Sequence, residues 1–183
     1  MKKLLKLVVL FIFMFIFYQL FIAPEQLTVE QQIDHDIDIT DLPSELHPVV
    51  AEKTADLIQR SGEIGISIII TDDYRSFEEQ DQLYAQGREN NSPVVTHARG
   101  GESYHNYGLA IDFALRSDNG EVIWDLNYDG NGNGQSDWLE VVDIAKDLGF
   151  EWGGDWEHFK DYPHLQMDFG FTIQELQQGQ RPD

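Results

Sequence analysis

The hydrophobic pattern changes its period several times along the chain, and each change predicts a different element. Apolar residues at helical spacing predict a helix of about three turns that starts at Ser44 and ends near Gly62. An apolar, β-branched run at 64–71 predicts a buried strand. A second helix is expected from Ser76, after which apolar residues again recur at helical spacing, to Gly87, which stops it.

The second half of the chain continues this mixture. Residues 109–115 form an apolar segment that predicts a central strand, and further short strands are expected at 121–126 and 163–169. Between the last two, residues 138–148 have helical periodicity that ends at Gly149. Because helices and strands are mixed in this irregular order, we predict an α+β fold with a small, mostly antiparallel sheet flanked by helices.

The N-terminal residues 1–23 follow neither pattern. Three lysines among the first six residues precede an almost entirely apolar run from Leu7 to Ala23. Such a segment is either a signal peptide or a membrane helix. Phe21 and Pro24 make the surroundings of Ala23 a poor signal peptidase site, so we expect an uncleaved, single-pass anchor helix in the cell membrane, with the domain outside the cytoplasm. Cleavage would instead give a secreted protein.

Composition indicates how the rest of the chain is organised and which partners are disfavoured. Residues 24–43 are rich in Gln, Asp and Glu, and we interpret them as an acidic stalk before a domain at 44–183. The formal net charge of -21 disfavours nucleic acid as a partner, because an acidic surface repels phosphates. The chain has no cysteine, so packing and bound metals rather than disulfides must hold the exported domain together. We expect a monomer.

Candidate chemistry is concentrated in the segment Ser-Tyr-His-Asn-Tyr-Gly-Leu-Ala-Ile-Asp at 103–112 and in Asp-Tyr-Pro-His at 161–164. Catalytic zinc takes three protein ligands and leaves one position for water, and histidine and carboxylate are both suitable ligands. His105 and Asp112 could meet where a loop runs into a strand, with His164 as the third ligand. Asp161 could then act as the base that removes a proton from the water.

These motifs resemble those of the zinc peptidases of bacterial cell walls, a family that includes VanY-type D-alanyl-D-alanine carboxypeptidases and VanX-type dipeptidases. The L-alanyl-D-glutamate endopeptidase branch is the more similar one. The shared segments cover most of residues 45–170 and are, in order, Tyr-Arg-Ser at 74–76, the helix segment 80–88, the motif 103–112, Gly-Phe-Glu-Trp-Gly-Gly-Asp-Trp at 149–156, and Asp-Tyr-Pro-His-Leu-Gln at 161–166.

The resemblance implies the fold shared by D-Ala-D-Ala peptidases and hedgehog-like domains, and it implies a role for each matching residue. His105, Asp112 and His164 match the zinc ligands of the family, and Asp161 matches its catalytic carboxylate. Arg75 matches an arginine that stabilises the developing oxyanion, although in a protein this acidic the alternative for Arg75 is a structural salt bridge.

Substrate contacts are also expected from within the shared motifs. The candidates are Ser103, Tyr104 and Trp156.

The resemblance implies a zinc-dependent hydrolase that cleaves peptidoglycan stem peptides, with the L-Ala-D-Glu bond as the expected target. One alternative is a D-alanyl-D-alanine carboxypeptidase that uses the same site. That branch usually has Glu where this chain has Asp161, and the shorter side chain favours the endopeptidase. A second alternative is a metal-stabilised wall-binding module without activity, which the presence of Asp161 argues against.

A second metal motif lies at 129–140. Its spacing fits the twelve-residue EF-hand calcium loop, with Gly134 at the sharp turn and ligands at positions 1, 3, 5, 7, 9 and 12, namely Asp129, Asn131, Asn133, Gln135, Asp137 and Glu140. A strand rather than a helix is expected before the loop, so the motif is EF-hand-like. We expect weak, structural Ca²⁺ binding at ~0.1 to 1 mM. The alternative is a Gly/Asn-rich hairpin tip that binds nothing.

Overall fold

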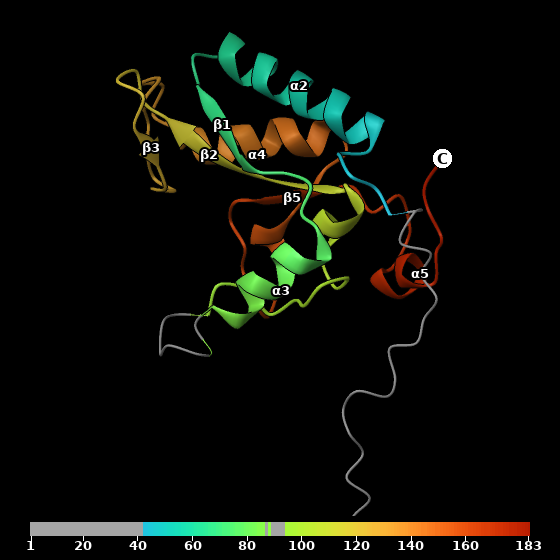
Figure 1. The fold of residues 1–183 in the computed structure, drawn as a ribbon. Coiled ribbons are helices and arrows are strands. Elements are labelled where there is room, and N and C mark those ends of the chain that lie inside the picture. Colours follow the sequence, from blue (N-terminus) through green and yellow to red (C-terminus); the bar gives the residue numbers. More distant parts are fainter. Residues whose placement is uncertain (1–41, 87, 89–93) are drawn as a thin grey trace, which may run out of the picture. The chain divides into compact units, whose positions relative to one another are not determined.

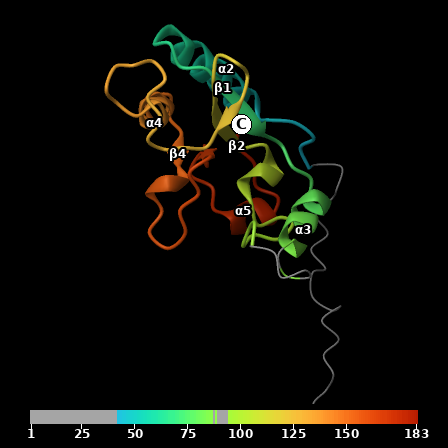
Figure 2. The same cartoon turned by 90° about the vertical axis from the view of Figure 1, so that its left-hand side faces the viewer.

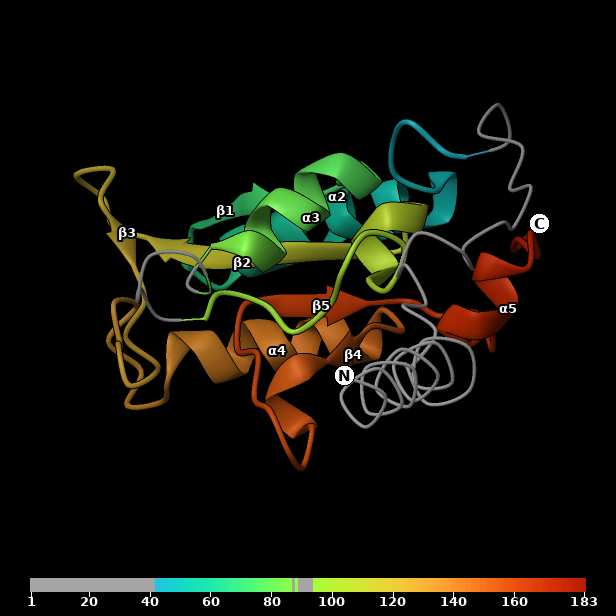
Figure 3. The same cartoon turned by 60° about the horizontal axis from the view of Figure 1, so that its bottom comes forward.

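The computed structural model describes residues 42–86, 88 and 94–183, and these residues are organised around an antiparallel five-stranded sheet (Figure 1). Four strands lie side by side in the order β1 (Ile68–Asp72), β2 (Ala110–Arg116), β5 (His164–Gln166) and β4 (Glu151–Trp152), as Figure 3 shows. The two-residue strand β3 (Val122–Ile123) pairs with β2. Every pairing is antiparallel, which confirms the predicted α+β fold with a small antiparallel sheet.

Strand β2 directs alternate side chains into the hydrophobic core and toward the polar face of the sheet. Successive side chains of a strand point to opposite faces. Ile111 and Phe113 are fully buried, and the ring of Phe113 packs against Trp138 at a centroid distance of 4.7 Å. Asp112, which lies between Ile111 and Phe113, therefore projects from the other face. The alternation places one carboxylate opposite the core at the centre of the sheet.

Two amphipathic helices cover the hydrophobic face. Helix α2 (Pro48–Glu63) buries Leu57, and helix α4 (Asp137–Asp147) buries Val141 and Trp138 against the sheet. Figures 1 and 2 show α2 and α4 together on one side, while α3 (Phe77–Ala85) and the short α5 (Ile173–Gln177) lie on the other. Two short 3₁₀ helices, η3 (Tyr104–Tyr107) and η4 (Gly153–Asp155), complete the fold.

The first predicted elements are present with shifted boundaries. The helix expected from Ser44 begins at Pro48, and its N-cap is His47, whose Nδ1 accepts a hydrogen bond from the amide of Val49 at 3.3 Å. The prediction for Ser44 is wrong because proline fits the first helical turn, where no intrahelical N–H is needed. The strand expected at 64–71 begins only at Ile68, since residues 64–65 form the turn that follows the helix.

Of the remaining elements, the helices match their predictions more closely than the strands do. Ser76 caps α3 as predicted, through a reciprocal hydrogen-bonded pair with Glu79, whereas Gly87 lies outside the described residues. Helix α4 matches its prediction within one residue at each end. The strands expected at 121–126 and 163–169 are shorter than predicted, at two and three residues. Strand β4, helix α5 and both 3₁₀ helices were not predicted, because such short segments carry no measurable period.

The predicted anchor at 1–23 and the stalk up to residue 41 lie outside the described residues. Among the helices that the structure describes, none is long and apolar enough to cross a membrane.

Candidate metal centre and substrate cleft

Three elements bring the predicted ligands together on the polar face of the sheet. Asp112 of β2 is the cross-strand partner of His164 on β5, so the two side chains are neighbours on one face. His105 comes from η3, which the side chain of Ser103 caps. Asn106 ties η3 to the segment after β1, because its amide donates to the carbonyl of Arg75 at 2.9 Å. The pairing of β2 with β5 and the anchored 3₁₀ helix η3 together place the three predicted ligands side by side.

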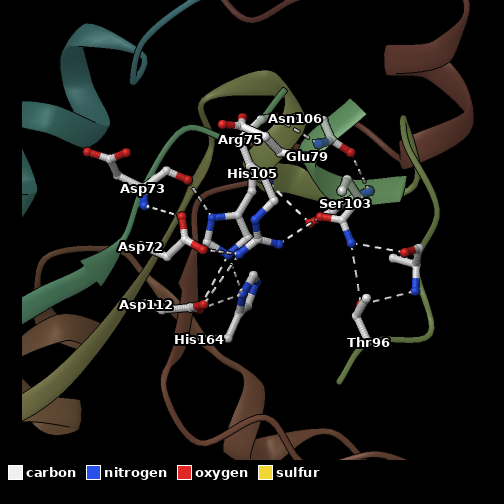
Figure 4. Close-up of polar contacts among 12 residues, drawn as sticks. Asp72, Asp73, Arg75, Glu79, Thr96, Ser103, His105, Asn106, Asp112 and His164 are labelled. Carbon is white, nitrogen blue, oxygen red and sulfur yellow. Dashed lines mark hydrogen bonds and ion pairs between the residues drawn. The ribbon is translucent and has the colours of Figure 1, made fainter. Parts of the chain in front are cut away.

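The three ligand atoms have the spacing of a tetrahedral metal site. His105 Nε2 lies 3.2 Å from His164 Nδ1, and each of these nitrogens lies 3.3 Å from Asp112 Oδ1. Ligands that bind zinc at about 2.0–2.1 Å in a tetrahedron are separated by about 3.3 Å. Figure 4 shows the two imidazoles and the carboxylate directed toward one another. Within the described residues, these are the histidine and carboxylate atoms that gather closely enough to hold one metal ion.

Hydrogen bonds on the outer side of each imidazole fix which ring nitrogen carries the proton. His105 Nδ1 lies 2.6 Å from the carbonyl oxygen of Asp73, which can only accept, so Nδ1 is the protonated nitrogen. His164 Nε2 lies 3.0 Å from Gln166 Oε1. The amide of Gln166 is itself oriented by donating to Glu151 Oε2 at 3.1 Å, so its oxygen must face His164. His164 therefore carries its proton on Nε2.

With both outer nitrogens protonated, the inner nitrogens of His105 and His164 face each other with lone pairs. The nearby Asp112 Oδ1 is a third electron-rich atom, and among the described residues it is buried without a well-formed hydrogen bond. Three lone pairs converging at about 3.3 Å repel one another unless a cation lies between them. His105 and His164 are only 2% and 5% exposed, so water screens this repulsion poorly. The residues present therefore fit a zinc-type cation.

The pKa shifts of Asp112 and His164 in the metal-free site also indicate that a cation is favoured there. Burial would raise the pKa of Asp112, but the attraction of the two imidazoles outweighs it and holds this pKa well below its usual value. Burial would lower the pKa of His164, yet the contact with Asp112 outweighs that effect and leaves the pKa of His164 raised. Both shifts reflect a site in which a negative carboxylate favours positive charge beside it.

Asp161, the predicted base, lines the same cleft as the three ligands. Its backbone amide donates to the carbonyl of Gly153 at 3.1 Å. Gly153 permits this close approach, since a Cβ there would lie 2.5 Å from the Asp161 carbonyl oxygen and 3.2 Å from the Cβ of His164. Burial, reinforced by the negative charge of Asp112, raises the pKa of Asp161. The environment thus makes Asp161 a stronger base than an exposed aspartate.

Arg75 projects into the cleft beside the metal ligands (Figure 4). Its guanidinium forms an ion pair with Asp72, lies 3.8 Å from Asp112 Oδ2, and donates to the buried Gln80 at 2.7 Å. A β-bulge between Ile70 and Asp72 shifts the register of β1 at this point and brings Asp72 opposite Asp112. Arg75 is therefore salt-bridged, as the structural alternative predicts, and it also lines the cleft, so its role toward the oxyanion stays a prediction.

The ligands lie in a cleft of about 600 Å³ whose polar and aromatic lining includes the predicted substrate residues. Two of these also have structural bonds: Ser103 Oγ accepts from the amide of His105, and the hydroxyl of Tyr104 donates to the carbonyl of Phe171 at 2.9 Å. The Trp156 ring lies 5.1 Å from that of His164. All three side chains line the cleft, and their contact with substrate stays a prediction.

Several residues that shape the site were not predicted. Gln166 could have been found from its position two residues after His164, because alternate residues of a strand share a face. Gln80 is fully buried and holds both Arg75 and the carbonyl of Ala98, a role that no sequence pattern indicated. Glu151 comes from another strand, so only the sheet pairing reveals its contact with Gln166.

The second predicted metal motif is at the N-terminal end of α4, which packs on the opposite face of the sheet. The structure brings the side chains of Asn131, Asn133 and Glu140 into contact. Gln135 was expected to contribute only its backbone carbonyl, and its backbone amide donates to Asn133 Oδ1 at 2.8 Å. The histidine and carboxylate cluster identified above contains none of these residues.

A three-ligand metal site with a free carboxylate beside it, in an open cleft, defines this protein as a metal-dependent hydrolase. The chain is 63% identical over 126 residues to the peptidoglycan L-alanyl-D-glutamate endopeptidase CwlK of Bacillus subtilis strain 168, a match that covers 69% of this chain and 75% of the relative. The chain therefore belongs to the family of peptidoglycan L-alanyl-D-glutamate endopeptidases, within the wider D-alanyl-D-alanine carboxypeptidase type of metallopeptidase.

The chain is also similar to a family model, a phage peptidase and a solved structure. The family model described as D-alanyl-D-alanine carboxypeptidase matches residues 96–167, which include all three metal ligands and Asp161. The L-alanyl-D-glutamate peptidase of Listeria phage A118 is 33% identical over 113 residues, and the match spans 62% of this chain but only 34% of the phage protein. The crystal structure of the Serratia marcescens L-Ala D-Glu endopeptidase ChiX aligns with a TM-score of 0.45 and 25% identity over 68% of this chain and 81% of that one.

Proposed function

We infer that this protein is a zinc-dependent peptidoglycan hydrolase that cleaves stem peptides between L-Ala and D-Glu. The observation that carries this conclusion is the convergence of His105 Nε2, His164 Nδ1 and Asp112 Oδ1 with the spacing of a tetrahedral site, open to a cleft. The choice of bond is supported by the 63% identity to the Bacillus subtilis enzyme, whose name states that specificity.

The protein residues around the metal site have separate tasks in this hydrolysis. When bound, zinc would supply a Lewis acid that lowers the pKa of a water molecule and polarises the scissile carbonyl. Asp161 accepts the proton of the attacking water and then delivers it to the nitrogen of the leaving peptide. The raised pKa of Asp161 suits a group that must take up a proton and release it again.

Arg75 stabilises the negative charge that develops on the carbonyl oxygen. Its guanidinium is held by Asp72 and Gln80, so its position is set before substrate binds. The contact with Asp72 leaves the arginine oriented rather than free to follow solvent. Binding of the stem peptide in the cleft then brings the scissile carbonyl between the metal site and this fixed cation.

A second candidate is a D-alanyl-D-alanine carboxypeptidase, which is favoured by the description of the family model that matches residues 96–167. The same metal site and the same base would serve either reaction, since only the position of the substrate in the cleft differs. Asp161 in place of the glutamate usual in that branch favours the endopeptidase.

Digestion of purified peptidoglycan with the zinc-loaded protein distinguishes these functions. Mass spectrometry of the products should reveal muropeptides with a new free amino group on D-Glu. Release of free D-Ala without that new terminus would support the carboxypeptidase instead. Absence of any cleaved product, with zinc bound, would leave a wall-binding module without activity and would overturn the proposal.

We also propose that residues 1–23 anchor the protein in the cell membrane, with the catalytic domain outside the cytoplasm, where peptidoglycan is found. The proposal is supported by the lysines that precede the apolar run. Protease added to intact protoplasts should degrade the domain, and the full chain should sediment with membranes. Full protection of the domain from the protease would contradict this topology.

A further inference from the structure

The loop at 129–140, which follows β3 and includes the first turn of α4, folds around the carboxylate of its first residue. Asp129 Oδ1 accepts a hydrogen bond from the amide of Asn133 at 3.1 Å, and Asp129 Oδ2 accepts one from the amide of Gly134 at 2.9 Å. Gly134 has a φ of +85°, in the left-handed region that favours glycine. The chain therefore bends back so that residues from both ends of the loop come close to each other.

Side chains from three loop positions meet at the carboxylate of Glu140. Asn133 Nδ2 lies 2.8 Å and 3.0 Å from the two oxygens of Glu140, and Asn131 Nδ2 lies 3.3 Å from one of them. Each amide also carries an oxygen, which accepts a backbone hydrogen bond: Asn131 Oδ1 from the amide of Asn133 at 3.1 Å and Asn133 Oδ1 from the amide of Gln135 at 2.8 Å. When a cation binds here, each amide would have to turn so that its oxygen rather than its nitrogen faces Glu140. These three groups can thus present four oxygen atoms to a single cation.

A separate observation concerns Asp137, the ninth residue of the loop. Asp137 is only 3% exposed, and its Oδ2 accepts a hydrogen bond from the amide of Gly130 at 3.0 Å. Gly130 is the second residue of the loop, so the carboxylate of Asp137 is directed back into it. Among the described residues, Asp137 Oδ1 is buried and has no hydrogen-bond partner. A buried carboxylate oxygen without a partner is costly, and a cation or a water bound to one would satisfy it.

The donor chemistry selects calcium among the common cations. All candidate donors are carboxylate, amide or backbone oxygens, and the segment contains no histidine or cysteine, which excludes a zinc-type site. Ca²⁺ accepts six to eight oxygen ligands in flexible geometry, and a glutamate at the twelfth position commonly supplies two of them. Mg²⁺ requires a tighter octahedral arrangement.

We propose that residues 129–140 bind one calcium ion, which fastens the start of α4 to the end of α2. Asn131 already donates to the carbonyl of Ile64 after α2, at 3.3 Å. Trp138, which directly follows Asp137, is 1% exposed and packs against Phe113 of the central strand. The ion therefore stabilises the packing of both core helices on the hydrophobic face of the sheet, away from the zinc centre.

The test is a calcium titration of the zinc-loaded full chain, followed by isothermal titration calorimetry and by the melting temperature. The expected result is one site with a Kd of ~0.1 to 1 mM and a higher Tm in 5 mM calcium, while 5 mM magnesium gives a much smaller shift. Glu140→Gln should weaken calcium binding more than tenfold and remove the Tm shift. The matched control Asp118→Asn removes one exposed acidic charge outside the loop and should retain both.

Three outcomes would overturn the proposal. The first is no calcium-dependent heat or Tm shift in the wild-type protein, a measurement that needs no variant to fold. The second is an unchanged shift in Glu140→Gln, which would place the ion elsewhere. The third is an equal loss in Glu140→Gln and Asp118→Asn, which would mean that calcium only screens the acidic surface.

Discussion

The two metal motifs of this protein differ in how their ligands are brought together. The zinc centre takes two ligands from the segment 103–112 and the third from β5, more than fifty residues later in the chain. Hydrogen bonds to Asp73 and Gln166 fix both imidazoles from outside. The loop at 129–140 takes all its donors from twelve consecutive residues, and several of these are hydrogen-bonded to one another. The first site is formed by the whole fold, whereas we propose that the second reaches its final conformation only when an ion binds.

This difference predicts that the two metal ions affect different properties of the protein. Zinc should control activity, and it should add to stability through its own ligands only, with little effect on the packing of α2 and α4, because those ligands lie on the polar face of the sheet. Calcium should control stability with little direct effect on the reaction, because its loop lies at the helical face. Variants of the zinc centre should therefore leave the calcium-dependent Tm shift intact.

The largest expected effect comes from Asp161→Asn. Loss of the base should reduce kcat by about 10²- to 10⁴-fold, while zinc content stays at one ion per chain because Asp161 is not a ligand. Zinc is measured by elemental analysis of the dialysed protein, and turnover by the appearance of new free amino groups on D-Glu. Glu157→Gln, a charge-matched change at an exposed residue nearby, serves as the control and should retain activity. Full activity of Asp161→Asn would exclude this residue as the base.

Arg75→Gln should lower kcat by about 10²- to 10³-fold, the usual cost of losing one oxyanion donor. Since Arg75 also pairs with Asp72, the variant must be separated from a folding defect. Its Tm and its zinc content should stay close to those of the wild type. A loss of Tm equal to that of Asp72→Asn, with kcat preserved, would show that Arg75 is only a structural partner.

A smaller effect is expected when the outer partner of His164 is removed. Gln166→Leu should weaken zinc affinity by about 10- to 100-fold, because the ring of His164 loses the contact that fixes its tautomer and orientation. Competition with a chelator of known affinity measures this change. Gln166→Glu retains an acceptor and should recover most of the affinity. Wild-type affinity in the leucine variant would mean that the strand alone positions His164.

The smallest and most specific effect is on pH dependence. In the metal-free protein the raised pKa of His164 means that its proton stabilises the fold below about pH 6.5, and this contribution is lost as pH rises through the raised pKa. Zinc replaces that proton, so zinc should raise Tm more at about pH 8 than at about pH 6. The calcium-dependent shift should change little over this window, since the loop contains no histidine. Equal zinc shifts at both pH values would contradict the coupling.

The sequence predicted those parts of the fold that carry a local signal. Ser76 was expected to start a helix, and α3 begins directly after it. The apolar segment before and after Asp112 is long enough to identify the central strand. Strand β4 and helix α5 were missed because two to five residues are too few to show periodicity, and their existence depends on pairing and packing with distant residues.

The candidate site also has a part that the sequence predicted and a part that it did not. Its three ligands and Asp161 were predicted from their order and spacing in the shared motifs, and the structure brings the ligands together. The contacts that orient them were not predictable, since Asp73 acts through a backbone carbonyl and Glu151 through the pairing of β4 with β5. A ligand can be predicted from a residue type, whereas its tautomer depends on the surrounding three-dimensional structure.

Above all, we expect the inner nitrogens of His105 and His164 and the carboxylate of Asp112 to hold one zinc ion. Anomalous diffraction at the zinc absorption edge, on crystals of the zinc-loaded protein, tests it most directly. The predicted result is one strong peak at about 2.0 to 2.2 Å from His105 Nε2, His164 Nδ1 and an oxygen of Asp112. Zinc bound through His105 Nδ1, or bound without Asp112, would contradict the account.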